Sequence, residues 1–583
     1  MHRRASHVVV LGGGIAGLSA AHTLRNSLRN TKITLLESSS RFGGWLWSER
    51  IEGFLFERGC RGIRPSGPGG QESIAMIEEL GIQRQAIVAS PAAASRFIWQ
   101  GPKKGLEKLP NSFIQGIRSP LTMSAPLWAV RDIFATPGPA SVSAISGNCA
   151  SENADESVSA FAQRHFGTHV ARVLLDAALG GIHAGDIDKL SARSVLPMLW
   201  EAEIQGTWAG GRAASVLLGL YRKRQIDVAA KVNDNTNTSS LSPFATAAAT
   251  AASLSFIDGV GALPAALISS LCEGDKPAVL LKDSPISALL PSPHGVHIVL
   301  ESGASLEADA VVCALPASDL ATILLRSLSS KGTNVSDDIA TMSAAASTAS
   351  TASAAASQTR ASVGVVSMAW RHAPPGLWSP GPAHAHSGFG YLVPRQARAR
   401  GTPPILGMTF DSTVFPGQSD AWSSSCLKKS TNTTPSTSNN STIIGPGTAA
   451  DVPIAIADSE TRITVMMGGA GAAADGAHVT NMSQEELVAC ALNAAREQAG
   501  VGAGGPPHTV RASIAHNAIP QYNVGHSIRE TAVRVGIQTS FSGRVELAGN
   551  SWGGIGAADA IRSGRIAARN VVARLTRNQS VIT

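Results

Sequence analysis

The 583-residue chain carries little charge and few aromatic side chains. Asp, Glu, Lys and Arg make up 15% of the residues, and Phe, Trp and Tyr make up 5%. Hydrophobic residues reach 44%, so a large core is available. The length is sufficient for two to four domains.

Long apolar runs are also missing. No stretch of 18 or more residues is strongly apolar, so we expect no transmembrane helix. Only six residues precede His7, where the first strand is expected to begin. This is too short for a cleavable secretory or mitochondrial presequence, so any organelle address should be internal or absent.

Cysteine and histidine clusters with metal-ligand spacing are lacking. No Cys-x-x-Cys spacing occurs, which argues against a disulfide framework and a zinc site. His384 and His386 lie among Pro, Gly and Ser with no partner cluster, so we predict no metal site. The six cysteines are Cys60, Cys149, Cys272, Cys313, Cys426 and Cys490.

The charge balance is basic, with a net charge of +7 and an isoelectric point near 9.2. Such a balance is typical of proteins that contact nucleic acid, an anionic membrane surface or acidic substrates. No nucleic-acid module and no basic run interleaved with aromatics is present, so we favour a membrane surface or acidic substrates. An ordinary solvated face remains the alternative for most of this charge.

The N-terminal stretch has the pattern of a dinucleotide site. Val8–Leu11 is a short β-branched apolar run, as expected for a strand buried on both faces of a parallel sheet. Gly12, Gly14 and Gly17 follow with Gly-x-Gly-x-x-Gly spacing. The first glycine permits the turn, the second allows a pyrophosphate to approach, and the third allows the next helix to pack on the strand.

An acidic residue completes this pattern. Residues 33–36 are expected to form the second strand, and Glu37 ends it, 23 residues after Gly14. A carboxylate at this position can accept the ribose hydroxyls of a dinucleotide. The alternative is a glycine turn in an ordinary βαβ unit.

A second strand-loop-helix pattern lies near the C-terminus. Residues 545–548 are apolar or strand-like, 549–556 are glycine-rich, and a helix is expected from Ala557. The helix N-terminus could stabilise negative charge on a reduced flavin. A purely structural strand-loop-helix unit is the alternative.

The remaining chain divides into strands and helices. Residues 72–90 suggest a helix and a connection, 96–109 a β-hairpin, and 484–500 a helix. Further strands are expected at 254–256, 279–286, 296–300, 308–314, 363–370, 389–393, 405–410 and 462–467.

Residues 111–221 have a helical pattern with two interpretations. The stretch around Trp128 combines bulky apolar residues with few charges, between Arg118 and Arg131. It suits a monotopic element in a membrane interface, but the residues by themselves favour an ordinary buried helix pair.

Four segments have low complexity and lack bulky apolar residues. We expect them to be disordered and functionally silent, because they cannot bury enough surface to offset the entropy of ordering. They are 136–156, 227–251, 327–360 and 417–450.

Several motifs together carry a family resemblance. Glu37, Arg41, Gly43 and Gly44 match the Glu-x(3)-Arg-x-Gly-Gly signature of the FAD-linked amine-oxidase-like superfamily. Within it the chain resembles the protoporphyrinogen oxidases, through residues 9–18, 36–38, 41–45, 59–65, 388–394, 519–526 and 547–549.

The resemblance implies an α/β fold, α+β overall, with three domains. A Rossmann-like FAD-binding domain would combine 1–95, 252–326 and 536–583. An antiparallel-sheet substrate-binding domain would combine 96–110 and 361–535. Residues 111–226 would form a helical membrane-binding domain, which favours the monotopic interpretation.

The resemblance also implies the reaction. Protoporphyrinogen IX would lose six hydrogens in three rounds to give protoporphyrin IX, with hydride transfer to the flavin of FAD and reoxidation by O2 to H2O2. No His-Asp or Cys-His pair stands out as a catalytic base. The family location implies the intermembrane-space face of the mitochondrial inner membrane, with ferrochelatase and a second copy of the chain as candidate partners.

Site residues carry over by position. Arg61 would pair with a substrate propionate, Phe389 and Leu392 would contact the tetrapyrrole, and the backbone of Gly390 would lie near the reacting carbon. Matched or expected FAD contacts are Gly12, Gly13, Gly14, Ile15, Ala16, Gly17, Glu37, Ser38, Arg41, Gly44, Trp45, Gly59, Cys60, Arg61, Gly62, Ile286, Asn550, Ile555, Gly556 and Ala557.

Two points oppose a direct transfer of function. The family usually has Pro where this chain has Cys60, and because cysteine does not fix φ we expect a less rigid loop. Arg61 could instead be a structural arginine in an ion pair. The alternatives to the implied activity are another flavin amine oxidase or desaturase, or an inactive flavin-binding membrane scaffold.

Overall fold

The structure is a computed structural model of the chain. It describes residues 6–28, 30–110, 125–139, 141–142, 154–233, 242–274, 276–330, 339–371, 388–398, 404–418, 460–471, 479–501 and 505–580. His384 and His386, with most of the segment 417–450, lie outside these ranges.

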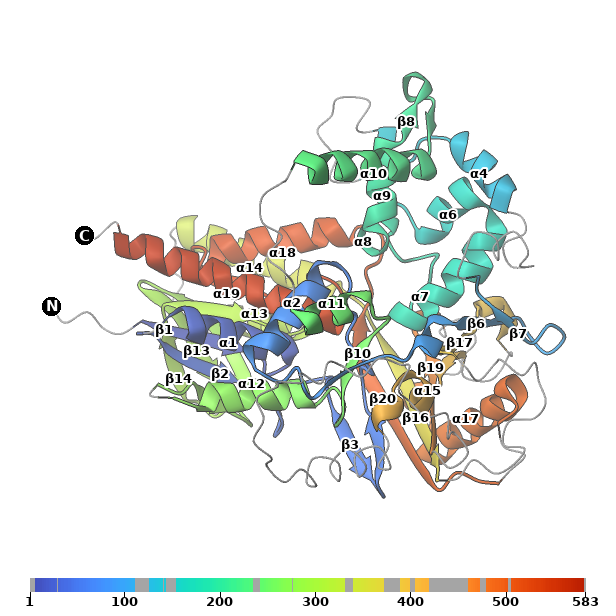
Figure 1. The fold of residues 1–583 in the computed structure, drawn as a ribbon. Coiled ribbons are helices and arrows are strands. Elements are labelled where there is room, and N and C mark those ends of the chain that lie inside the picture. The colour runs from blue at the N-terminus through green and yellow to red at the C-terminus, as the bar shows by residue number, and fades with distance from the viewer. Residues whose placement is uncertain are drawn as a thin grey trace, which may run out of the picture.

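A five-stranded parallel sheet is the centre of the first unit (Figure 1). Its order is β11 (Val279–Leu281), β2 (Lys32–Leu36), β1 (His7–Leu11), β15 (Ala310–Cys313) and β21 (Val545–Leu547). The apolar runs predicted as doubly buried strands are confirmed, because alternate residues of β1 enter different cores. Val8 and Val10 belong to one hydrophobic cluster, while Val9 and Leu11 belong to another.

Helices and a small sheet cover the two faces. One core contains α1 (Ile15–Ser27), α2 (Gly67–Glu79), α12 (Ala262–Cys272) and α19 (Ala557–Ser580). The other contains the antiparallel strands β12 (Ile286–Ser292), β13 (Gly295–Leu300) and β14 (Ser305–Ala308), with α13 (Ala317–Ser330), α14 (Ile339–Ala356) and α18 (His526–Ser540).

A seven-stranded sheet forms the second unit. Its order is β20 (Thr509–Pro520), β16 (Arg360–Trp370), β19 (Thr461–Gly468), β18 (Ile405–Thr409), β17 (Gly390–Leu392), β6 (Arg96–Trp99) and β7 (Leu106–Lys108). The predicted antiparallel sheet and the hairpin at 96–109 are confirmed, with one parallel pair between β17 and β6. The predicted helix at 484–500 is α17 (Gln484–Ala499), which begins with a capping box at Ser483.

A helical unit lies beside β6 and β17, away from β1 and β2 (Figure 1). It contains α4 (Ala125–Ile133), α6 (Val158–Phe166), the π-helix η2 (Val170–Leu175), α7 (Asp176–His183), α8 (Ala192–Val195), α9 (Pro197–Gln205) and α10 (Val216–Asn233). Arg395 ties this unit to the second sheet, since its guanidinium lies 2.6 Å from Asp186 and 3.4 Å from both Asp176 and Asp188.

Short elements lie between and within the three units. The strand pairs are β3 (Ser48–Ile51) with β4 (Phe54–Glu57), β5 (Ala86–Val88) with β10 (Leu254–Phe256), and β8 (Thr207–Trp208) with β9 (Ala213–Ala214). The short helices are η1 (Pro91–Ala94), η3 (Ala209–Gly211), α11 (Pro243–Thr250), η4 (Arg395–Ala397), α15 (Asp411–Val414), η5 (Pro416–Gln418) and η8 (Val479–Asn481).

The prediction of disorder is wrong for the described parts of the low-complexity segments. The helix α11 lies within 227–251 and buries Ala245 and Ala248. The helix α14 lies within 327–360 and buries Ala352 and Ala355 between α13 and α18. Small side chains bury little surface alone, but they let helices approach closely where a neighbour presents a complementary face. Of the segment 136–156, Ser141 and Ala154 are buried.

The described helices contain no segment with both the length and the apolar character needed to cross a membrane.

Candidate functional site

The glycine turn between β1 and α1 has the backbone that its sequence requires. Gly12 has φ +96°, a conformation that L-residues with a side chain rarely adopt. A Cβ at Gly17 would collide with the carbonyl oxygen of Gly12. Both positions therefore need glycine for the fold itself.

Gly14 is different, because its surroundings are open. A Cβ at Gly14 would meet no protein atom within 4 Å, and no side chain caps the helix that begins at Ile15. The first-turn amides of Ile15, Ala16 and Gly17 form the positive end of α1 at this opening. An open, uncapped helix N-terminus fits the pyrophosphate of a dinucleotide.

Glu37 is held next to this opening. One of its carboxylate oxygens accepts a hydrogen bond of 2.7 Å from the Gly13 amide. The other accepts bonds from the amide and hydroxyl of Ser39, at 2.9 and 2.7 Å, and lies 3.4 Å from the Ser38 hydroxyl. The predicted carboxylate and glycine loop are thus brought together with defined geometry.

The second signature packs directly on the first. The Gly43 amide donates to the Gly13 carbonyl at 2.8 Å, and a Cβ at Gly44 would lie 3.0 Å from the Cα of Gly14. Arg41 donates to the carbonyls of Phe42 and Gly44, and therefore holds its own loop. Trp45 follows with 44% of its surface exposed.

The C-terminal loop reaches the same edge of the sheet. β21 lies next to β15, which lies next to β1, so parallel strands deliver both loops to their carboxyl ends. Asn550, Ile555, Gly556 and Ala557 lie in this loop and at the start of α19. The Asp559 carboxylate accepts a hydrogen bond from the Gly556 amide, and burial raises the pKa of Asp559. Ile286, at the start of β12, is buried in the same hydrophobic cluster as Leu36 and lies outside both loops.

The Gly59–Gly62 loop is closely packed. A Cβ at Gly59 would collide with the carbonyl of Trp45, and one at Gly62 with the hydroxyl of Ser253. Cys60 donates its thiol to the Gly62 carbonyl at 2.7 Å, and burial raises the pKa of this thiol to about 11. A local side-chain bond therefore holds the loop where the family's proline is absent.

Arg61 forms the ion pair considered as its alternative role. Its Nε lies 3.5 Å from an oxygen of Asp411, and one of its terminal nitrogens contacts the Met466 sulfur at 3.8 Å. Asp411 also accepts bonds from the hydroxyls of Thr409 and Thr464. Among the described residues, the buried Nε and Nη2 of Arg61 form no hydrogen bond, and the two N–H groups of Nη2 therefore remain for a ligand.

The residues predicted to contact substrate lie on or next to β17. Gly390 has φ +141°, and a Cβ there would collide with the Met408 carbonyl. Phe389 packs near Ala93 and Phe415, whereas Leu392 packs towards the helical unit. The two apolar side chains therefore enter different clusters.

Two groups near this site escaped the sequence reasoning. The Arg96 guanidinium, on the strand next to β17, lies 5.7 Å from the centre of the Phe389 ring. Burial raises the pKa of Glu57 to about 7, although bonds from the Ser48 hydroxyl and the Val260 amide oppose the shift. Glu57 directly precedes the Arg58–Gly62 segment, so only its position next to the motif could have drawn attention to it.

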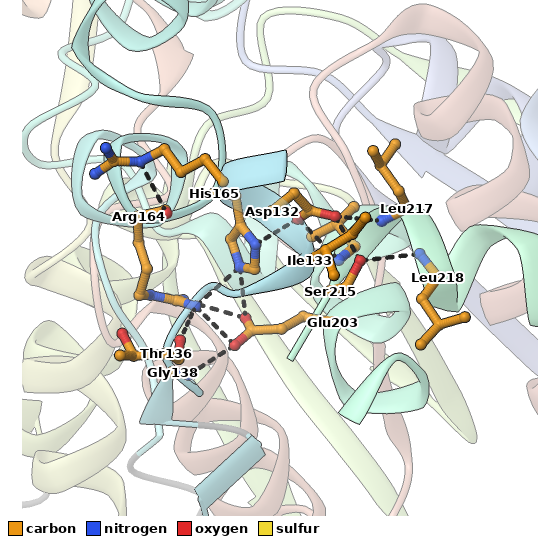
Figure 2. A network of polar contacts seen from close by, with 12 residues as sticks. Asp132, Ile133, Thr136, Gly138, Arg164, His165, Glu203, Ser215, Leu217 and Leu218 are labelled. Atoms are coloured by element: carbon orange, nitrogen blue, oxygen red, sulfur yellow. Dashed lines mark hydrogen bonds and ion pairs between the residues drawn. The ribbon is translucent and has the colours of Figure 1, made fainter. Parts of the chain in front are cut away.

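A buried charge network holds the helical unit together (Figure 2). Asp132 of α4 accepts bonds from the Ser215 hydroxyl at 2.6 Å and from the Val216 and Leu217 amides at 3.0 and 2.9 Å. It thus caps the N-terminus of α10 from another helix. His165 of α6 lies 2.7 Å from the same carboxylate.

Glu203 of α9 forms the other half of this network. It accepts a bond from the Gly138 amide at 2.7 Å and from Arg164 at 2.8 Å. Burial alone would raise the pKa of Glu203, but the contacts with His165 and Arg164 outweigh this effect and lower the pKa to about 2. The network joins α4, the loop at Gly138, α6, α9 and the start of α10, and therefore fixes their relative positions. All of these contacts join segments of the helical unit to one another, so we interpret the network as structural.

Within the part of the chain that the structure describes, no three His, Cys, Asp or Glu residues are grouped to hold a metal ion.

Comparison with known proteins gives a consistent result. Residues 15–354 match the family described as flavin containing amine oxidoreductase. Over 577 residues the chain is 31% identical to the protoporphyrinogen oxidase of Bos taurus and 30% identical to that of Homo sapiens. Each alignment covers 97% of this chain and 98% of the relative.

Solved structures share the fold. A candidate protoporphyrinogen oxidase from Exiguobacterium aligns with a TM-score of 0.64 at 19% identity, covering 98% of this chain and 99% of the other. Cyclohexylamine oxidase from Brevibacterium oxydans aligns with a TM-score of 0.55 at 14% identity, covering 98% of this chain and all of the other (100%). At these identities the likeness concerns the fold alone.

The open space at Gly14 gives a test of dinucleotide binding. We expect Gly14→Ala to leave the melting temperature of the FAD-free protein nearly unchanged, because the new methyl group meets no protein atom. It should weaken FAD binding by at least about tenfold, because the methyl group occupies space needed by the pyrophosphate. Gly17→Ala is the contrasting variant and should lower the FAD-free melting temperature. Equal FAD affinity in wild type and Gly14→Ala would contradict this placement.

The buried network gives a prediction about pH. The pKa of Glu203 falls from its usual 4.5 to about 2, so its stabilisation is complete above pH 4.5 and is lost as the pH falls through 2. Glu203→Gln should therefore destabilise the protein by about 3 kcal/mol at pH 7, and the difference from wild type should shrink below pH 4.5. Thermal unfolding across pH measures both effects.

Glu201→Gln on the same helix is the matched control. Its side chain is 58% exposed and lies 3.7 Å from Lys223, so its removal should change stability little. A constant difference between wild type and Glu203→Gln at every pH would refute the prediction.

Proposed function

Because the chain belongs to the flavin-containing amine oxidoreductase family and, within it, to the protoporphyrinogen oxidases, we propose that it oxidises protoporphyrinogen IX to protoporphyrin IX in haem synthesis. The observation that carries the proposal is the alignment with animal protoporphyrinogen oxidases at 30–31% identity over 98% of their length. The enzyme is an FAD-dependent oxidoreductase.

The conversion removes six hydrogens in three rounds of two. Bound FAD supplies a two-electron acceptor that O2 can reoxidise with release of H2O2. The chain contributes positioning and electrostatics. The amides at the start of α1 and the Glu37 carboxylate suit the dinucleotide, and the α19 N-terminus suits negative charge on the flavin ring.

The other residues predicted as FAD contacts are proposed in the same role. They are Ser38, Arg41, Gly44, Trp45, Gly59, Cys60, Arg61, Gly62, Ile286, Asn550, Ile555, Gly556 and Ala557. The division into FAD-binding, substrate-binding and membrane-binding domains is proposed with the boundaries given above.

Arg61 is proposed to anchor a carboxylate of the substrate. Its unpartnered Nη2 supports this role, since a buried guanidinium nitrogen without an acceptor is unfavourable. Arg96 is a second cation near Phe389 on the neighbouring strand. Phe389, Gly390 and Leu392 are proposed to contact the tetrapyrrole. Glu57 is assigned no catalytic role, because its oxygens already accept bonds from Ser48 and Val260.

The decisive assay follows porphyrin fluorescence. Purified protein with FAD and O2 should convert colourless protoporphyrinogen IX into fluorescent porphyrin, with about three H2O2 formed per porphyrin. Another flavin amine oxidase or desaturase would bind FAD and form no porphyrin from this substrate. An inactive scaffold would also bind FAD, but it would oxidise neither protoporphyrinogen IX nor the substrates of those other enzymes.

Arg61→Ala should raise KM by about tenfold or more, because a charge-assisted hydrogen bond to substrate is lost. FAD affinity should fall much less. Asp411→Asn is the control for the ion pair, since it breaks that pair and leaves the Arg61 side chain in place. If both variants have the same KM, Arg61 is a structural residue, and Arg96→Ala then tests the second cation.

Monotopic attachment to a membrane is proposed for the helical unit. On α4 and the residue after it, Leu127, Val130 and Phe134 share one helical face and are 72%, 57% and 68% exposed. Leu217 and Tyr221 of α10 are also exposed, at 43% and 61%. Such apolar side chains on one unit support contact with a lipid surface.

Vesicle co-sedimentation tests this attachment. The double variant Leu127→Ser, Phe134→Ser should reduce the bound fraction several-fold, because less apolar surface enters the bilayer. Val535→Ser on α18 is the control, since Val535 is 58% exposed but lies outside the helical unit. Equal loss in both variants, or in neither, would refute the attachment surface.

The cellular location is proposed as the intermembrane-space face of the mitochondrial inner membrane. A relative from Nicotiana tabacum is named a mitochondrial protoporphyrinogen oxidase, and one from Arabidopsis thaliana a chloroplastic/mitochondrial one. Ferrochelatase, as the next enzyme for the product, and a second copy of the chain are the proposed protein partners. Protease protection of isolated mitochondria, with and without the outer membrane, tests the location.

A further inference from the structure

Tyr522 occupies a position where the three units meet. It follows β20 of the second sheet, and only 5% of its surface is exposed. Its ring stacks on His526, with ring centres 3.9 Å apart and planes tilted by 9°. The direction of the side chain is therefore fixed by packing.

The hydroxyl of Tyr522 makes two hydrogen bonds to one loop. It donates to the Asn550 carbonyl at 2.6 Å and accepts from the Gly554 amide at 3.0 Å. Burial raises the pKa of Tyr522, so the group stays protonated and can serve as donor and acceptor together. We define 549–556 as the C-terminal flavin loop. One side-chain oxygen thus joins both halves of this loop.

Other contacts hold the middle and the start of the loop, where Ser551 accepts bonds from the Ala317 amide and the Gln358 side chain and the Gly549 amide donates to Ser563. The Tyr522 hydroxyl is the group that joins the Asn550 carbonyl to the Gly554 amide. Gly549 and Gly554 have φ values of +104° and +114°, so the backbone is permissive at both positions. Two bonds across such a segment restrict how it can move. The loop leads directly into α19, and its shape decides where the Gly556 and Ala557 amides point.

The backbone of Tyr522 is attached to the helical unit. Its carbonyl accepts a bond of 2.8 Å from the Ser191 amide, and the Val524 amide donates to the Lys189 carbonyl at 2.9 Å. Asp155 reinforces this attachment, since its two oxygens accept from the Ser191 hydroxyl at 2.8 Å and from the Gly525 amide at 2.7 Å. A single residue therefore contacts the helical unit by its backbone and the flavin loop by its side chain.

We propose that Tyr522 is a positioning residue that sets the C-terminal flavin loop against the cofactor and ties this setting to the helical unit. The proposal rests on FAD binding, which the proposed function also requires. It adds a route by which the helical unit influences cofactor affinity, through the contacts of residues 189–191 with 522–525.

The test measures FAD affinity of the full-length protein. Tyr522→Phe keeps the ring and its stacking but leaves the Asn550 carbonyl and the Gly554 amide without their partner. The Kd for FAD should rise about tenfold, and the stabilisation of the protein by added FAD should fall accordingly. The visible absorption band of bound flavin should also shift, since the loop is expected to lie against the ring.

Tyr391→Phe is the matched control. Tyr391 is also buried, and its hydroxyl donates a hydrogen bond of 3.0 Å to the Gln498 side chain. Gln498 lies on α17 and not in the C-terminal flavin loop. We expect a lower melting temperature with an unchanged FAD Kd. If Tyr522→Phe behaves like Tyr391→Phe, the inference is overturned.

Asp155→Asn keeps the proposal testable should Tyr522→Phe fail to fold. It weakens the hold on Gly525 without altering the Tyr522 side chain or the loop. The FAD Kd should rise about two- to fivefold, a smaller effect than that of removing the hydroxyl. An unchanged Kd would overturn the inference. Failure of the wild-type protein itself to bind FAD would instead refute the proposed function.

Discussion

The close packing of the last helix on the first is the contact on which the cofactor site depends. α19 crosses α1 so closely that a Cβ at Gly564 would collide with the carbonyl of Ala16. β21, which leads into α19, is the edge strand of the same parallel sheet. Because parallel strands end at a common edge, residues about 540 positions apart in the chain, Gly12 and Gly556, are delivered to one place.

The site therefore has two kinds of support. The Gly12–Gly17 turn and Glu37 are local to one βαβ unit, and their geometry follows from short-range sterics and from the hydrogen bonds that Glu37 accepts from Gly13 and Ser39. The Arg61 and β17 region depends on contacts between units, such as the Arg61–Asp411 pair and the packing of Leu392 towards α7. Substitutions in the Gly12–Gly17 turn or at Glu37 should weaken FAD binding. Substitutions in the Arg61 and β17 region should weaken substrate binding or the packing between units.

A few of the charged side chains form contacts inside the protein. Only 15% of the residues are charged, yet Asp132, Glu203 and Arg164 form a buried network inside the helical unit. Such a network stabilises when complete and destabilises strongly when one partner is lost. It allows α4 to carry exposed apolar side chains on its outer face while its inner face is fixed by Asp132.

The sequence by itself determined the elements whose causes are local. These are the buried strands β1, β2 and β15, the glycine turn, the hairpin at 96–109, and the motifs that relate the chain to its family. Only the tertiary structure decided that α14 is ordered, that the thiol of Cys60 closes its own loop, and that Arg61 has Asp411 as a partner. It alone joined Tyr522 to both the flavin loop and the helical unit. The physical reason is that a glycine conformation or an apolar period acts within a few residues. Burial, ion pairing and packing of alanine helices depend on which distant surfaces meet.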